Sequence, residues 1–166
     1  MEMKKTISVL VENQPGVLAR IAGLFSGRAF NIDSLAVGET EDPQVSRMTI
    51  VARGEEMILE QIVKQLNKLI DVIKVVDMTA ETHVERELAL VKIGALKKKS
   101  DLLSVLKIFK AKVLDVSKES YLVEVTGDDE KISSFIEAVS EFGVKEMSRT
   151  GTIAMGRSKK AGKAKK

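Results

Sequence analysis

The sequence predicts an α+β chain made of two consecutive βαββαβ units, and three observations lead to this fold class. Short β-rich runs alternate with segments whose apolar residues recur at helical spacing. The same order of elements occurs twice along the 166 residues. An apolar content of 44% is enough for two small cores, in each of which two helices cover one antiparallel sheet. Each unit therefore follows the split βαβ plan of ferredoxin-like folds.

The first unit is predicted over residues 1–79. Its strands are expected at 6–12, 31–37, 45–52 and 72–78, with one helix from about Pro15 to Ser26 and a second that opens at Glu55. The acidic stretch 38–44 predicts an exposed hairpin tip. The apolar helix faces are expected to consist of Leu18, Ile21, Ala22 and Phe25 in the first helix and Leu59, Ile62, Val63 and Leu66 in the second.

The second unit is predicted over residues 80–156, after a polar connector at 79–87. Its strands are expected at 88–96, 113–117 and 121–126, with a closing strand within 144–155. One helix is expected from Asp101, and Asp128 or Asp129 is placed to cap another. The predicted core faces of these helices are Leu102, Val105, Leu106 and Phe109, and Ile132, Phe135, Ile136 and Val139.

The basic character of the chain lies in its last ten residues. Six of the 27 Lys and Arg residues fall in 157–166, where there is no acid, and their removal leaves 21 bases against 24 acids. We therefore expect a slightly acidic folded body and a disordered basic tail at 157–166. Nucleic acid is not an expected partner, because the body lacks a basic surplus and has few aromatic residues. The absence of a long apolar run and of a signal-peptide pattern predicts a cytoplasmic protein without a membrane partner.

Few residues could support catalysis. The chain has no cysteine, its one histidine is His83, and neither a Gly-x-Ser-x-Gly turn nor a phosphate-binding glycine motif is present. Glu81, His83, Glu85 and Glu87 alternate, which could be a metal site on an extended segment or simply a polar surface. One histidine among carboxylates favours the polar surface. We expect no catalytic residue, metal or cofactor in this chain, and therefore no enzyme activity of its own.

The corner where the first strand becomes a helix is the best candidate for a binding site. Pro15 suits a first helical turn, and Asn13 is placed to cap it. The N–H groups of Gly16, Val17 and Leu18 should point outward without intrahelical acceptors, an arrangement that attracts anions. The alternative is an ordinary strand-to-helix turn. In the second unit the matching corner, 97–100, has neither Gly nor Pro, so no small-ligand site is expected there.

Dimerisation would complete this site. In the spatial order 4-1-3-2, the second strand lies at an edge, where pairing with its copy across a two-fold axis would form an eight-stranded sheet. That pairing would carry the partner's Asn31 to the corner. A carboxylate could then bind the free N–H groups, while Asn13 and Asn31 accept from an ammonium group. Val17, Leu18 and Ile32 would suit a small branched side chain, so the expected ligand is an amino acid.

These residues resemble a known family. The patterns Asn13-x-Pro15-Gly16-Val17-Leu18 and Arg28-x-x-Asn31-Ile32-x-Ser34-Leu35 are similar to the ligand-binding signature of ACT domains. With the stretches 46–50, 61–72 and 83–92, the chain from Lys5 to about Gly156 resembles the small, regulatory subunits of acetolactate synthase, also called acetohydroxyacid synthase.

The resemblance implies a non-catalytic subunit that activates a large catalytic subunit and mediates feedback inhibition by valine in branched-chain amino acid biosynthesis. Thiamine diphosphate, Mg²⁺ and FAD are expected in that large subunit and not in this chain. The first unit would be an ACT domain that binds the effector and forms a homodimer or higher homo-oligomer. The implied effector residues are Asn13, Gly16, Val17 and Leu18 of one chain with Asn31 and Ile32 of the other. A free-standing ACT regulator that binds DNA through the basic tail is the alternative.

Overall fold

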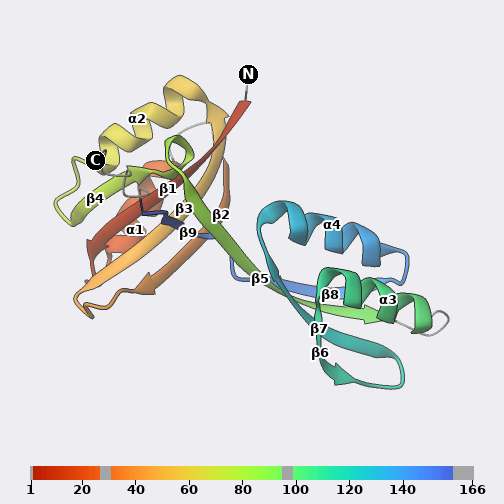
Figure 1. Ribbon diagram of the computed structural model, residues 1–166. Coiled ribbons are helices and arrows are strands. Elements are labelled where there is room, and N and C mark those ends of the chain that lie inside the picture. The colour runs from red at the N-terminus through yellow and green to blue at the C-terminus, as the bar shows by residue number, and fades with distance from the viewer. Residues whose placement is uncertain (1, 27–30, 95–98, 159–166) are drawn as a thin grey trace, which may run out of the picture. The chain divides into compact units, whose positions relative to one another are not determined.

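The structure is a computed structural model that describes residues 2–26, 31–94 and 99–158, and it divides into two units (Figure 1). The first unit contains the chain up to Val84 together with the described residues from Ala154 onward, and the second contains Glu85–Ile153. The sequence placed the boundary at 79/80 and assigned everything up to 156 to the second unit. In the structure the end of the chain instead returns to the first unit.

The first unit is one antiparallel sheet with the order β2-β3-β1-β4 and two helices. Its elements are β1 (Glu2–Glu12), α1 (Val17–Ser26), β2 (Asn31–Glu39), β3 (Val45–Glu55), α2 (Glu56–Leu66), β4 (Val72–Asp77) and the short 3-10 helix η1 (Met78–Ala80). The predicted strand order is confirmed. Because β3 is antiparallel to both neighbours, the edge strand β2 runs parallel to β1, as expected.

The core of the first unit lies between the helices and one face of the sheet. Ile7, Val9 and Val11 alternate along β1 and are almost completely buried. The α2 face agrees with the prediction, because Leu59, Ile62 and Leu66 are buried and Val63 packs against them. The predicted α1 face was wrong at its start. Val17 enters the core, whereas Leu18 is 45% exposed.

The opposite, outer face of this sheet is also largely buried. Thr6, Ser8 and Thr49 point away from the helices, yet each is at most 5% exposed. The returning strand β9 (Ile153–Gly156) accounts for part of this burial. The backbone nitrogen of Ala154 donates a hydrogen bond to the Thr49 hydroxyl oxygen, 3.4 Å away. Hydroxyl side chains suit this face because they can satisfy a backbone donor.

The second unit repeats the plan with the sheet order β6-β7-β5-β8 and two helices. Its elements are β5 (His83–Gly94), α3 (Lys99–Phe109), β6 (Lys112–Val116), β7 (Ser120–Gly127), α4 (Asp129–Ser140) and β8 (Val144–Arg149), and β9 also pairs with β5. Leu102, Leu106, Ile132, Phe135 and Val139 form the buried helix faces as predicted, with Val105, Phe109 and Ile136 partly buried against them.

The second unit contains a carboxylate that an arginine holds with two hydrogen bonds. The Glu87 side chain is 3% exposed and accepts two hydrogen bonds from the Arg149 guanidinium, at 2.5 and 2.7 Å. Arg149 also pairs with Asp129 at 3.2 Å. The hydrogen bonds from Arg149 to Glu87 are the main reason that the pKa of Arg149 is raised above its ordinary value. This cluster joins β5, β8 and the first turn of α4.

Two predictions for the second unit were wrong in extent. The polar connector is shorter than expected because β5 begins at His83, and the single closing strand predicted within 144–155 is two strands, β8 and β9. The break falls at Gly151, whose φ of +83° interrupts the extended backbone. Of the two residues predicted to cap α4, Asp128 does so. Its side chain accepts a hydrogen bond from the Lys131 backbone N–H at 2.9 Å.

Some predictions fall on residues outside the described ranges. These are the end of the first helix at Gly27 and Arg28, most of the basic tail, and Lys97 and Lys98 in the second corner. Among the described residues, no helix combines the length and the apolar character that crossing a membrane requires.

Candidate functional site

The candidate site is the corner between β1 and α1. β1 ends at Glu12, and residues 13–16 turn the chain before α1 begins at Val17, two residues later than predicted. Gly16 has a φ of +87°, a left-handed conformation that side chains with a Cβ adopt only with strain. A Cβ added at Gly16 would have no atom within 4 Å, so the space in front of this glycine is open. The glycine is thus required by the turn and leaves the backbone accessible.

Asn13 does not cap α1, which corrects the sequence prediction. Its side-chain amide nitrogen donates to the Pro43 carbonyl at 2.9 Å and to the Glu39 carboxylate at 3.2 Å. The Asn13 backbone N–H donates to the Gln44 carbonyl at 2.7 Å. Because both side-chain partners can only accept, the orientation of the amide is fixed. The Asn13 side-chain carbonyl oxygen accepts no hydrogen bond from the residues that the structure describes.

The start of α1 presents donors to solvent. Within the described ranges, no protein acceptor serves the N–H groups of Gly16 and Leu18, as expected for a helix start. The Val17 N–H makes one long contact, 3.4 Å, with the Gln14 carbonyl. Two of the three predicted donors are therefore free, and the third is weakly engaged. Such a group of amides favours an anion.

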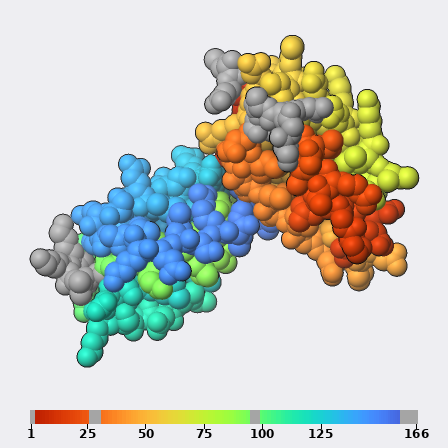
Figure 2. All heavy atoms as spheres, turned by 180° about the vertical axis from the view of Figure 1, so that it is seen from behind, coloured from red at the N-terminus to blue at the C-terminus, as the bar shows by residue number. Residues whose placement is uncertain are grey.

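The side chains at this corner divide between core and surface. Val17 is 2% exposed and belongs to the core, so it can offer a ligand its backbone only. Leu18 is the accessible apolar side chain. Figure 2 shows the red-orange atoms of α1 at the surface of the first unit, beside orange atoms of β2.

Asn31 and Ile32 lie at the other end of the sheet. Asn31 pairs with Arg53, and Arg53 pairs with Lys4, eight residues before the end of β1. At about 3.3 Å per strand residue, Asn31 is roughly 26 Å along the sheet from Glu12. Asn31 is exposed and its amide donates to Asp33 at 3.4 Å, whereas Ile32 packs against the core. One chain therefore does not bring the six predicted residues together.

Two charged neighbours were missed by sequence reasoning. Glu39, at the end of β2, holds the Asn13 amide and supplies a carboxylate to the corner. Arg20 pairs with Asp71 at 3.1 Å, which balances the charge next to the free N–H groups. The sequence identified residues 38–44 as an acidic, exposed tip, but it carried no signal that this tip folds back onto Asn13.

The alternating segment at 81–87 does not gather into a metal site. Glu87 is engaged by Arg149, and the His83 Nδ1 atom lies 2.8 Å from the Glu81 carbonyl oxygen. In the part of the chain that the structure describes, no group of three or more His, Cys, Asp or Glu residues could hold a metal ion. The polar-surface interpretation accounts for Glu81 and Glu85, while Glu87 is structural.

Comparison with known proteins identifies both halves of the chain. Residues 7–74 match the model of the AHAS small subunit-like ACT domain, and residues 86–158 match that of the small subunit of acetolactate synthase. A probable acetolactate synthase small subunit from Archaeoglobus fulgidus is 53% identical over 95% of this chain and 99% of its own length. The acetolactate synthase small subunit from Aquifex aeolicus is 50% identical over 93% of this chain and 81% of its own length.

The fold comparison agrees with the sequence comparison. The crystal structure of the acetolactate synthase small subunit from Thermotoga maritima superimposes with a TM-score of 0.85 and 41% identity, covering 95% of this chain and 99% of that one. The chain therefore belongs to the family of acetolactate synthase small subunits, with an ACT domain in its first half and a regulatory, non-catalytic role.

Proposed function

We propose that this chain activates a large catalytic subunit of acetolactate synthase and makes it sensitive to valine, which binds at the β1–α1 corner. The observation that carries the proposal is the pair of free N–H groups at Gly16 and Leu18 in front of an open space. A valine carboxylate would accept from these donors, and charge-assisted hydrogen bonds contribute about 1.5–3 kcal/mol each.

The other end of the amino acid would meet acceptors. The Asn13 side-chain carbonyl oxygen is available, and the Glu39 carboxylate lies beside it. Leu18 is the accessible apolar side chain for the valine side chain. Because one methylene is worth only about 1–3 kcal/mol, we expect a graded preference for valine over leucine and isoleucine rather than exclusion.

A homodimer would bring Asn31 and Ile32 into the same pocket. β2 has a free edge, and an antiparallel pairing of two copies centred on Leu35 would set Asn31 opposite the partner's Glu39, at the corner end of the sheet. The register of β2 shifts between Ile32 and Ser34, so with this centre regular pairing is expected at residues 34–36, and residues 37–39 would face the irregular part of the partner strand. Each dimer would have two pockets. The linkage of effector to subunit pairing would supply the allosteric coupling.

The central test is a titration of the purified chain into the catalytic subunit, loaded with thiamine diphosphate, Mg²⁺ and FAD, while acetolactate formation is measured. We expect the rate to rise with added chain and to fall again when valine is present. A chain that leaves the rate unchanged at every ratio would refute the activating role, and activation that valine does not reduce would refute the effector assignment alone.

The shared pocket is tested with mixed dimers. A dimer with Gly16→Asp on one chain and Asn31→Ala on the other should keep one intact site. A dimer in which one chain carries both changes and the other is wild type should lose both sites. Calorimetric counting of valine sites distinguishes these dimers, and the reverse pattern would show that the pocket lies within one chain.

A further inference from the structure

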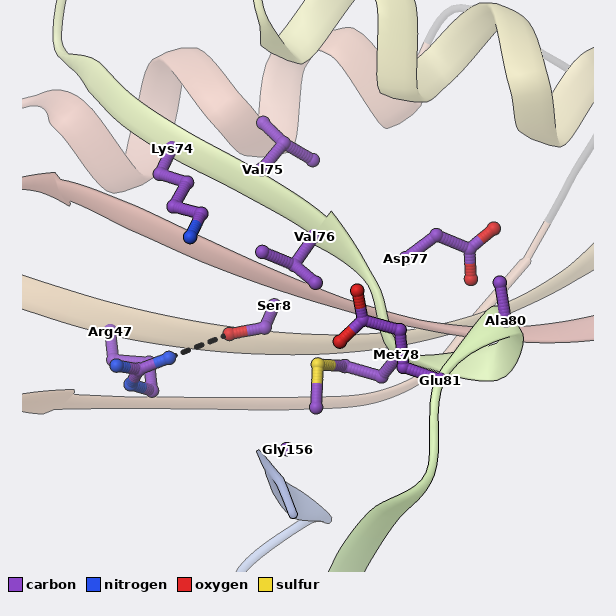
Figure 3. A pocket seen from close by; sticks show the side chains of 10 residues that line it. All are labelled: Ser8, Arg47, Lys74, Val75, Val76, Asp77, Met78, Ala80, Glu81 and Gly156. Atoms are coloured by element: carbon purple, nitrogen blue, oxygen red, sulfur yellow. Dashed lines mark hydrogen bonds between the residues drawn. The ribbon is translucent and has the colours of Figure 1, made fainter. Parts of the chain in front are cut away.

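The first unit has a pocket on the outer face of its sheet (Figure 3). The pocket has a volume of about 560 Å³ and is lined by residues of β1, β3, β4, η1 and the end of β9. None of the residues of the β1–α1 corner lines it. The family assignment and the proposed valine site leave this pocket without a role.

One side of the pocket carries two cations, for which the described residues provide no acidic partner. The Arg47 guanidinium is half-buried and donates to the buried Ser8 hydroxyl oxygen at 3.1 Å. In the described ranges, neither Arg47 nor Lys74 has a carboxylate within 4 Å. Arg47 and Lys74 are the two cross-strand neighbours of Leu10, so they lie on the same face of the sheet. A half-buried guanidinium bonded only to a neutral hydroxyl is well suited to bind a planar carboxylate.

The pocket also contains an acceptor and an apolar surface. The Glu81 carboxylate belongs to no ion pair within the described residues, whereas Asp77 is neutralised by Lys5 at 3.0 Å. In the view of Figure 3, Arg47 and the Glu81 carboxylate lie on either side of Ser8, with Val76 and Met78 next to Glu81. The site thus offers positive charge on one side, negative charge on the other and apolar atoms nearby.

We propose that this pocket binds a small carboxylic acid that carries a hydrogen-bond donor on the adjacent carbon, namely an α-amino or an α-hydroxy acid. The ligand carboxylate binds Arg47 and Lys74, and its ammonium or hydroxyl group donates to Glu81. A simple anion can bind the two cations, but it has no hydrogen-bond donor to offer the Glu81 carboxylate. A simple cation meets Arg47 and Lys74 with no acceptor. The proposal does not depend on valine binding at the corner.

Three ligands with the same carbon skeleton separate these chemistries: L-alanine has an ammonium group, L-lactate a hydroxyl group, and propionate neither. Each is titrated into the full-length chain that carries Gly16→Asp, so that the β1–α1 corner is blocked. Amide NMR shifts report the location of binding. We expect alanine or lactate to shift the amides of Ser8, Lys74 and Glu81, and propionate to bind at least about 10-fold more weakly than the better of the two.

Substitutions identify the groups that recognise the ligand. Arg47→Met should weaken ligand binding at least about 10-fold. Arg47→Lys keeps the charge but loses the bidentate donor, so its affinity should lie between those of Arg47→Met and the wild type. Glu81→Gln should weaken the binding of alanine more than the binding of lactate. Lys64→Met removes an exposed α2 lysine outside the pocket and should change nothing.

The outcomes are decisive in either direction. Unchanged affinity in a folded Arg47→Met chain, or no shift of the three amides with any ligand at millimolar concentration, would overturn the proposal. If propionate binds as tightly as alanine and lactate, the pocket is a general anion site, and the role proposed for Glu81 is contradicted. Shifts confined to residues 13–18 in the chain without Gly16→Asp would support the valine site and refute this one.

Discussion

The two units share one fold plan but place their polar groups differently. Among its described residues, the first unit leaves donors free at the start of α1, and its buried Asp71 pairs with an arginine that is 53% exposed. The second unit buries Glu87 and satisfies it with Arg149, and it closes the start of α4 with the Asp128 side chain. The same arrangement of strands and helices can therefore leave backbone donors open in one unit and satisfy a buried carboxylate in the other, because a fold does not determine its sites.

The largest expected effect is the loss of valine binding when a carboxylate is placed at the first corner. Gly16→Asp should weaken binding at least about 100-fold, since two like charges about 4 Å apart cost several kcal/mol near a protein surface. Gly16→Asn is the matched control, because Asn and Asp tolerate the left-handed φ similarly and differ in charge. Calorimetry should show that Asn retains much of the affinity.

The corresponding change in the second unit sharpens this comparison. Ser100, in the first turn of α3, is exposed and occupies the corner that lacks Gly and Pro. Ser100→Asp should leave valine affinity unchanged. A loss as large as that of Gly16→Asp would show that the two corners do not differ in the way described.

A smaller but still large effect is expected on the stability of the second unit. Glu87→Ala leaves Arg149 without its main partner, and breaking a buried pair costs about 3–5 kcal/mol. Because the Arg149 side chain is 33% exposed, water can solvate it after Glu87 is removed. We therefore expect Glu87→Ala to reduce the stability by about 2–3 kcal/mol. In the first unit, Arg20→Met breaks an ion pair whose arginine is 53% exposed and whose Asp71 side chain is 12% exposed, so we expect a smaller cost, about 1 kcal/mol. Urea unfolding measures both, and equal costs would contradict the contrast.

The helix caps should differ by a more modest amount. Asp128→Ala removes the side-chain acceptor of α4 and should destabilise the chain by about 1 kcal/mol. Glu55, which precedes α2, makes no side-chain cap hydrogen bond, so Glu55→Ala should be close to neutral. Thermal unfolding of the two variants against the wild type tests this difference.

The smallest effect concerns an exposed pair of the second unit. The hydrogen bond and charge of Lys92 hold the pKa of Glu146 below its ordinary value of 4.5. A lowered pKa means that this pair stabilises the folded state above the ordinary pKa and that the stabilisation is lost as the pH falls through the lowered value. An NMR titration of Lys92→Met should return the Glu146 pKa toward its ordinary value, and an unchanged pKa would exclude Lys92 as the cause.

Local patterns predicted the elements and most of the core. The spacing of Leu59, Ile62 and Leu66 identified the buried face of α2, and the order of elements led to the correct sheet order. The prediction failed at the start of α1, where both Val17 and Leu18 are apolar and periodicity could not choose between them. Gly16 decides this choice, because its left-handed turn delays the helix to Val17.

Long-range contacts explain the remaining differences. Asn13 binds Pro43 and Glu39, which are about thirty residues away, so the capping role that its position suggested is not used. Glu87 formed part of an alternating polar pattern, and only its pairing with Arg149, 62 residues later, shows that it is buried. A sequence pattern identifies which side chains are polar, but not which distant group satisfies them.

The return of β9 to the first unit means that this unit is assembled from two separate pieces of chain. During synthesis, the outer face around Thr49 has to wait for Ala154, so the ribosome must finish the whole second unit before the first is complete. A fragment that stops at Val84 would leave that face uncovered. Translation through β9 is thus a condition for a finished first unit.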